Sequence, residues 1–133
     1  MTDTLAQAQY QLLFHGYAIG PAGVEAKSGG HRMPKMLFSP GGKISITAIG
    51  PDESQSSIKT IEIAFKAQGD APPSPLGDGK NARYVWHRGN PPVTIGETAG
   101  KWTFTATLLD HNGKGYAVPD PEFQVGDGSD HGL

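Results

Sequence analysis

The five histidines are the side chains of this sequence best suited to bind a metal ion, because neutral imidazole is a ligand for zinc, copper or nickel. None of them stands at a short ligand spacing from another, so a histidine site would have to be assembled from distant loops. We therefore expect surface and turn histidines without a bound metal, and a loop-built metal site is the third of three functional hypotheses. The five are His15, His31, His87, His111 and His131.

The segment 110–115 imitates the start of a calcium-binding loop, which places oxygen ligands at alternate positions before a glycine. Two residues break the pattern. Lys114 occupies a ligand position, and Pro121 stands at the twelfth position, where a bidentate glutamate is required. The dipeptide Asn112-Gly113 instead predicts a hairpin turn.

No local signature of an enzyme active site is present. The chain has no cysteine, which excludes a thiolate nucleophile, a thiolate zinc site and a disulfide framework. It also has no Gly-x-Ser-x-Gly elbow, and the segment 77–81 has the glycine and lysine of a phosphate loop without its spacing or a following helix. The sequence therefore favours a protein that is not an enzyme and that needs no cofactor.

Charge and hydropathy narrow the choice of partner and compartment. The formal net charge is −2, and no block of like charges offers the clustered lysine and arginine that nucleic acid requires. No apolar run approaches the roughly 18 residues of a membrane span, and residues 1–11 do not resemble a leader. We expect a cytoplasmic protein with neither nucleic acid nor membrane as a partner, although a secreted protein without its leader would have the same composition.

Aromatic side chains suggest a site for a carbohydrate or another small ligand. Tyr84 and Trp86 share one side of a predicted strand, and Arg88 follows them. Exposed aromatic faces can stack on a sugar or another flat ligand, and Trp86 is the best single candidate, with core packing as its alternative. Trp102 is in phase with Phe104 and is predicted to lie in the core.

These side chains must be positioned by short strands. The chain has 19 glycines and 11 prolines, which interrupt regular structure often, and its apolar residues alternate with polar ones. The segment 6–19 fits a helix and a strand, and its alternation favours the strand. The other predicted strands are 43–50, 58–67, 82–87, 92–95, 101–109, 115–118 and 122–125.

Seven or eight short strands without a convincing helix predict an all-β fold with two packed antiparallel sheets. An immunoglobulin-like β-sandwich formed by a single domain, residues 1–133, is the first choice, and a jelly roll or a small barrel is the alternative. The tail 126–133 is rich in glycine and aspartate and is expected to fray.

Two long connections, 20–42 and 68–81, exceed the usual length of a loop. The first contains Met33, Met36 and Phe38, which are too apolar for a solvated loop, so it is expected to form a short edge strand or to pack onto a partner. The second is rich in proline and is expected to be a stiff excursion that ends in a flexible turn.

The carboxyl-terminal part of the chain carries a resemblance to a known family. Segment 100–104 leads through a hairpin to 116–118, and a last strand then begins with Asp120-Pro121. This pattern resembles the closing hairpin of small bacterial immunoglobulin-like proteins called the DP-EP family. The resemblance implies a sandwich fold and a bacterial source, and it implies no catalytic or binding residue.

These observations favour a non-enzymatic interaction or assembly module. Its partner would be another protein or a second copy of the chain in a homo-oligomer, bound through exposed sheet edges and through Met33, Met36 and Phe38. On this hypothesis, charged substitutions at Met36 and Phe38 dissociate an assembly without unfolding the domain.

Overall fold

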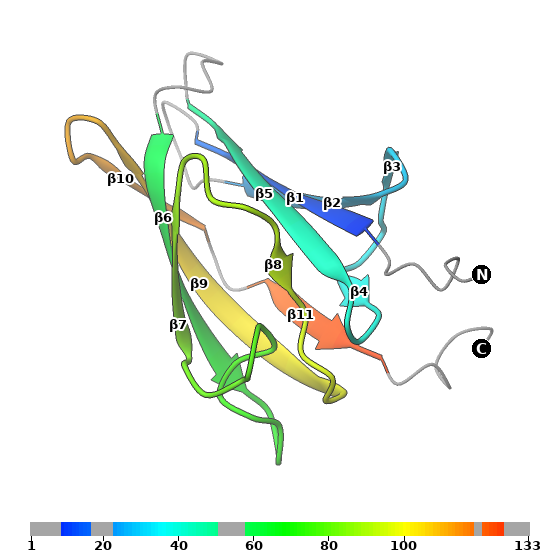
Figure 1. Cartoon of the computed structure of the whole chain (residues 1–133). Helices are drawn as coiled ribbons and strands as arrows, with labels where there is room; N and C mark the ends of the chain where they lie inside the picture. Colours follow the sequence, from blue (N-terminus) through cyan, green and yellow to red (C-terminus); the bar gives the residue numbers. More distant parts are fainter. Residues whose placement is uncertain (1–8, 17–22, 51–57, 119–120, 127–133) are drawn as a thin grey trace.

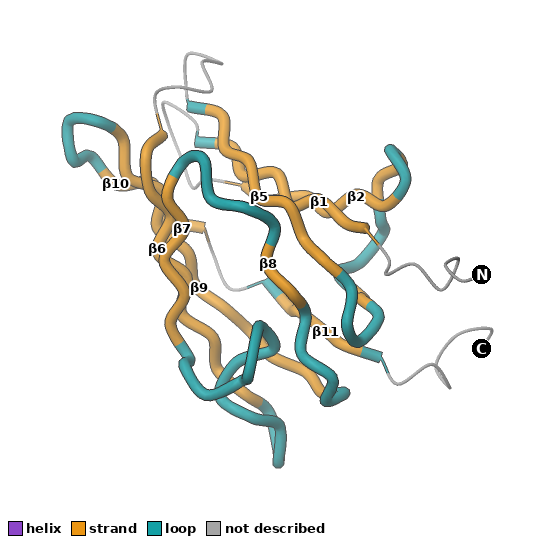
Figure 2. Tube along the Cα trace, viewed as in Figure 1, coloured by secondary structure: helices purple, strands orange, loops and turns teal. Residues whose placement is uncertain are grey.

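A computed structural model describes residues 9–16, 23–50, 58–118 and 121–126. These residues form strands, turns and loops, and none of them is in a helix (Figures 1 and 2). Two sheets pack face to face, so the predicted all-β sandwich is confirmed. The strands are β1 Gln9–His15, β2 Gly23–Ser28, β3 His31–Arg32, β4 Leu37–Phe38, β5 Lys43–Ile49, β6 Ile58–Ala67, β7 Arg83–His87, β8 Val93–Thr94, β9 Gly100–Asp110, β10 Gly115–Val118 and β11 Glu122–Val125.

The first sheet has the strand order β3-β2-β1-β5-β8, and the second has the order β4-β11-β9-β6-β7, with β10 paired to β9 as well. All neighbours are antiparallel except two pairs, β1 with β5 and β11 with β4, which are parallel. The expectation of purely antiparallel sheets is therefore wrong at these pairs. A parallel pair requires a crossover connection, and the chain makes one by passing from the first sheet to β4 in the second before it returns as β5.

Alternation along the strands builds the core between the sheets. On β9, the residues Trp102, Phe104 and Leu108 are buried, while the threonines between them face the other side of the sheet. Phe123 of β11 lies 6.4 Å from Phe104, measured between ring centroids. The prediction that Trp102 is a core residue is confirmed.

The predicted strand positions agree closely with the observed ones. Segments 58–67, 115–118 and 122–125 are strands with the predicted bounds, and segment 6–19 contains a strand rather than a helix. The hairpin of β2 and β3 inside the connection 20–42 was not expected, because Ala26 is the only fully buried residue of β2 and leaves no apolar alternation to detect. The short edge strand expected in that connection is confirmed as β4.

The connection 68–81 leaves the second sheet and pairs with the edge of the first. Leu76 forms a β-bridge with Ile95, and the amide of Gly77 donates a hydrogen bond of 2.8 Å to the carbonyl of Thr94 in β8. The indole Nε1 of Trp102 donates to the carbonyl of Pro72 at 2.7 Å. This connection therefore covers the outer edge of β8.

The predicted hairpin between β9 and β10 is confirmed. The amide of Gly113 donates to the carbonyl of Asp110, and Gly113 has a φ of 85°, which suits glycine at the end of a three-residue loop. The Asp110 carboxylate accepts hydrogen bonds of 2.9 Å from the amides of Asn112 and of Lys114, so it holds the turn. Residues 127–133 of the tail lie outside the described residues.

Removal of the Asp110 carboxylate is expected to destabilise this hairpin in a pH-dependent way. Partial desolvation acts to raise the pKa of Asp110, but the hydrogen bonds from the backbone of Lys114 and Asn112 and from the Tyr116 hydroxyl outweigh it and hold the pKa below its ordinary value. The stabilisation is therefore fully present above the unfolded carboxyl pKa of about 3.9 and disappears as the pH falls through the lower, folded pKa.

This effect is measured by urea unfolding of the natural protein and of Asp110→Ala, once at neutral pH and once at a pH well below the folded pKa of Asp110. We expect the variant to be less stable at neutral pH and the two proteins to converge in acid. Asp110→Asn is the matched control, since its amide oxygen can still accept hydrogen bonds but does not titrate. A stability difference between Asp110→Ala and the natural protein that is the same at both pH values would contradict the prediction.

Candidate functional site

The aromatic residues predicted as a ligand platform do not form one. Trp86 is only 3% exposed, because on β7 it alternates with the exposed residues Val85 and His87 and faces the core between the sheets. The expectation of an exposed Trp86 is therefore wrong. Tyr84, on the same side, is half-buried, and burial raises the pKa of its phenol.

Arg88 is engaged by the fold itself. Its guanidinium donates hydrogen bonds of 2.9 and 2.6 Å to the carbonyl of Ile58 and one of 3.2 Å to the carbonyl of Ala48. Its central carbon lies 5.6 Å from the ring centroid of Trp86. Burial lowers the pKa of Arg88 from its ordinary value, yet an arginine stays protonated in a protein. Because Ala48 and Ile58 belong to different sheets, these hydrogen bonds from Arg88 join the two sheets.

Of the predicted partner-binding residues, Phe38 lies in the folded core, and Met33 and Met36 pack against it. Phe38 is fully buried, and its ring lies 4.8 Å from Tyr10 and 4.6 Å from Phe123, measured between centroids. Met33 and Met36 are partly buried and pack against that core. The expectation that a charged residue at Phe38 leaves the domain folded is therefore wrong, because the charge would be buried among aromatic rings.

The histidines of the described residues do not gather into a metal site. No group of three or more histidine, aspartate and glutamate side chains in this part of the chain could hold a metal ion. His15 lies 3.2 Å from the carboxylate of Glu25, while His31, His87 and His111 are exposed and His131 lies outside the described residues. No helix in the described ranges is long and apolar enough to cross a membrane.

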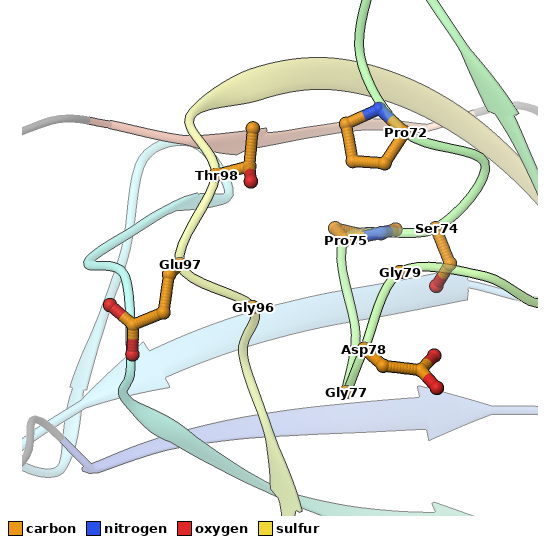
Figure 3. A pocket seen from close by; sticks show the side chains of 9 residues that line it. All are labelled: Pro72, Ser74, Pro75, Gly77, Asp78, Gly79, Gly96, Glu97 and Thr98. Carbon is orange, nitrogen blue, oxygen red and sulfur yellow. The ribbon is translucent and has the colours of Figure 1, made fainter.

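A small hollow lies where the connection 68–81 meets the segment after β8 (Figure 3). Its volume is about 70 Å³, and its lining includes Ser74, Asp78, Glu97 and Thr98. The two carboxylates stand on opposite sides of it in Figure 3, and that of Asp78 already accepts a hydrogen bond of 3.0 Å from the amide of Lys80. The hollow is much smaller than the several hundred cubic ångströms of a typical ligand pocket, so it does not define a binding site.

The free edges of the sheets are a different kind of candidate site, because an edge strand presents unpaired backbone groups to other chains. Strands β3, β4 and β8 are each two residues long, and the connection 68–81 covers β8. Strand β7 is five residues long and ends the second sheet, beside β6 (Figure 1). Of the strands that stand at the end of a sheet in the described part of the chain, it is the longest.

The pairing register shows which groups of β7 face outward. Phe65 donates to the carbonyl of Ala82, and Arg88 donates to the carbonyl of Lys59. Backbone groups of an antiparallel strand face alternate sides, so those of residues 84 and 86 face β6, and those of residues 83, 85 and 87 face away from it.

Only two of these outward-facing residues have free backbone groups. The amide of His87 donates to the side chain of Asn90 at 2.8 Å, and the carbonyl of His87 accepts from the amide of Asn90 at 2.9 Å. Arg83 and Val85 retain an outward N–H and C=O each. Val85 is 37% exposed and is the only exposed large hydrophobic side chain in the described residues. We call the backbone edge of Arg83 and Val85, with these side chains, the β7 edge.

Strand β10 also has an outer edge, with backbone groups of Gly115 and Ala117 facing away from β9. It is a poorer template, because glycine weakens a strand and because Pro119, one residue after β10, has no N–H to donate. It therefore serves as a matched comparison for the β7 edge.

The β7 edge was not predicted from the sequence, which indicated only a strand at 82–87 and exposed edges in general. The side chains that were singled out on this strand, those of Tyr84 and Trp86, lie on the side of β7 that faces the core. No model of a known protein family matches the sequence, and the curated proteins compared with it include none with significant similarity. The resemblance to the DP-EP family stays a prediction.

Proposed function

We propose that this protein is a non-enzymatic interaction module that binds an extended segment of another polypeptide by strand addition at the β7 edge. The observation that supports it is the coincidence, on one strand, of two residues with free outward backbone groups and of the exposed Val85. Strand addition takes its affinity from backbone hydrogen bonds and its selectivity from alternate side chains.

The electrostatics of this edge suit an apolar or acidic partner segment. The Arg83 guanidinium is 3.0 Å from the Glu62 carboxylate on β6; the Arg83 side chain is largely exposed and that of Glu62 is partly exposed. A surface pair of this kind contributes little to stability and can be rearranged at low cost. Arg83 can therefore turn to an acidic side chain on an added strand, while Val85 contacts an apolar one.

Substitution of Val85 by proline is expected to weaken peptide binding strongly without unfolding the domain. Proline removes the outward N–H, and proline is tolerated at edge positions whose N–H faces away from the neighbouring strand. The measurement is selection of peptides from a displayed library of random extended sequences, followed by titration of the enriched peptides against the natural protein and the variant. We expect at least a roughly tenfold loss of affinity, which corresponds to about 1.4 kcal/mol.

Ala117→Pro is the matched control, because it removes an equivalent outward N–H from β10. It should leave peptide binding unchanged. Failure to enrich any peptide whose binding depends on Val85, or equal losses in the two proline variants, would contradict strand addition at β7. Circular dichroism of both variants verifies that the sheets are intact.

Three finer attributes belong to the same proposal. They are an immunoglobulin-like subclass of the sandwich, a bacterial source, and a cytoplasmic location. The absence of cysteine from the sequence supports the last, since it is compatible with a reducing compartment. The subclass and the source have the DP-EP resemblance as their support.

A further inference from the structure

Resting on the proposed strand addition, we infer that the segment bound at the β7 edge is the β7 edge of a second copy of this chain, paired antiparallel about a twofold axis at Tyr84. The second sheet of one copy and the second sheet of the other would then form one continuous sheet. The inference follows from the positions of the free backbone groups and of the charges on β7.

Hydrogen bonding favours the register in which Arg83 of each copy stands opposite Val85 of the other. Residues that are opposite each other in a hydrogen-bonded antiparallel pair exchange two N–H to O=C bonds. This register forms two such pairs, so it makes four bonds and uses every free group of Arg83 and Val85. The register with Val85 opposite its own copy would place Arg83 opposite His87, whose groups Asn90 already occupies, and would make only two bonds.

Charge favours the same register. A register centred on Arg83 would put two guanidinium groups directly opposite each other, which is unfavourable. In the register centred on Tyr84, each Arg83 instead faces the apolar Val85 of the other copy. The positive charge of each Arg83 remains compensated by Glu62 of its own chain, on the side away from the new strand pair.

The inner side of the joined sheet is also compatible with this arrangement. Tyr84 would stand opposite its own copy in a non-hydrogen-bonded pair, where Cα atoms are about 4.5 Å apart and side chains are in contact. Its phenol is half-buried in one copy, so the opposite ring would cover its exposed part. Aromatic pairs across antiparallel strands are favourable.

Single cysteines test the register directly, because the natural chain has none. Tyr84→Cys places two thiols in the non-hydrogen-bonded pair, within the Cα separation that a disulfide accepts. Val85→Cys places them diagonally, at about 7–8 Å, which is too far. Ala117→Cys on β10 reports the rate of random collision. We expect Tyr84→Cys to form a disulfide-linked dimer about tenfold faster or more than either other variant under mild oxidation.

The masses of the natural protein and of Val85→Pro, measured by native mass spectrometry over a range of concentrations, complete the experiment. We expect a dimer of the natural protein that Val85→Pro abolishes and Ala117→Pro retains. Faster cross-linking through Val85→Cys, or a dimer that survives Val85→Pro, would overturn the inference. A natural protein that stays monomeric while library peptides still bind in a Val85-dependent way would also overturn it and would leave the proposed function standing. A natural protein that stays monomeric and binds no library peptide in a Val85-dependent way would overturn both the inference and the proposed function.

Discussion

Replacement of Phe38 by alanine is expected to lower the free energy of unfolding by about 3–5 kcal/mol, the range found for large aromatic side chains in well-packed cores. Phe38 is fully buried between Tyr10 of the first sheet and Phe123 of the second. Its carbonyl also accepts a hydrogen bond of 2.9 Å from the amide of Gly126. Removal of the ring leaves a cavity where the two sheets meet, and denaturant unfolding measures the loss.

Met36→Ala is the matched control for Phe38→Ala. Met36 lies on the same connection but is only partly buried, so we expect its replacement to cost about 1 kcal/mol. Neither variant should change self-association of the folded protein. A Phe38→Ala protein that keeps its stability but loses a partner would contradict the assignment of Phe38 to the core and would restore the connection 20–42 as a partner-binding surface.

The two tryptophans are expected to respond differently to replacement by phenylalanine. Trp102→Phe should cost about 2–4 kcal/mol, because it removes buried volume and leaves the carbonyl of Pro72 without its donor. Trp86→Phe should cost about 2 kcal/mol less. The indole Nε1 of Trp86 is buried and has no hydrogen-bond partner among the described residues, so its removal relieves the cost of an unsatisfied donor.

Urea unfolding of the two variants, followed by circular dichroism, checks this difference. The lost volume is the same in the two substitutions, so a difference between them isolates the contribution of the indole N–H to a first approximation. Equal losses would show that the Pro72 hydrogen bond does not stabilise the connection 68–81. The same connection should then be as accessible to proteases in Trp102→Phe as in the natural protein.

Much of the fold could be predicted because it depends on neighbours in sequence. The alternation of apolar residues along β5, β6 and β9 indicates which side of each strand faces the core, and this pattern is contained within the sequence of each strand. The turn at Asn112-Gly113 is local too. Strand β2 escaped prediction for the same reason, since with Ala26 its only fully buried residue it carries no alternation.

The candidate site could not be predicted, because it depends on strand order. The strand at 82–87 has an open edge only because β7 ends the second sheet, and no spacing in the sequence reveals that position. The hydrogen-bond partners of Arg88 are also distant along the sequence, since Ile58 is 30 residues away and Ala48 is 40 residues away. Tyr84 and Trp86 were correctly placed on one side of a strand, but which side would face the core depends on the sheet opposite.

The parallel pairing of β4 with β11 has a consequence for how the chain reaches its folded state. Residues 37–38 emerge from the ribosome long before their partners, residues 124–125. The ring of Phe38 therefore has no complete binding surface until almost all of the other strands have been synthesised. Contacts between segments so distant along the chain are slow to form, and an exposed apolar segment is prone to aggregation while it waits. The hairpin of β1 and β2 and the pair of β6 and β7 can form before that moment, so closure of the sandwich by β11 should be the last step of folding.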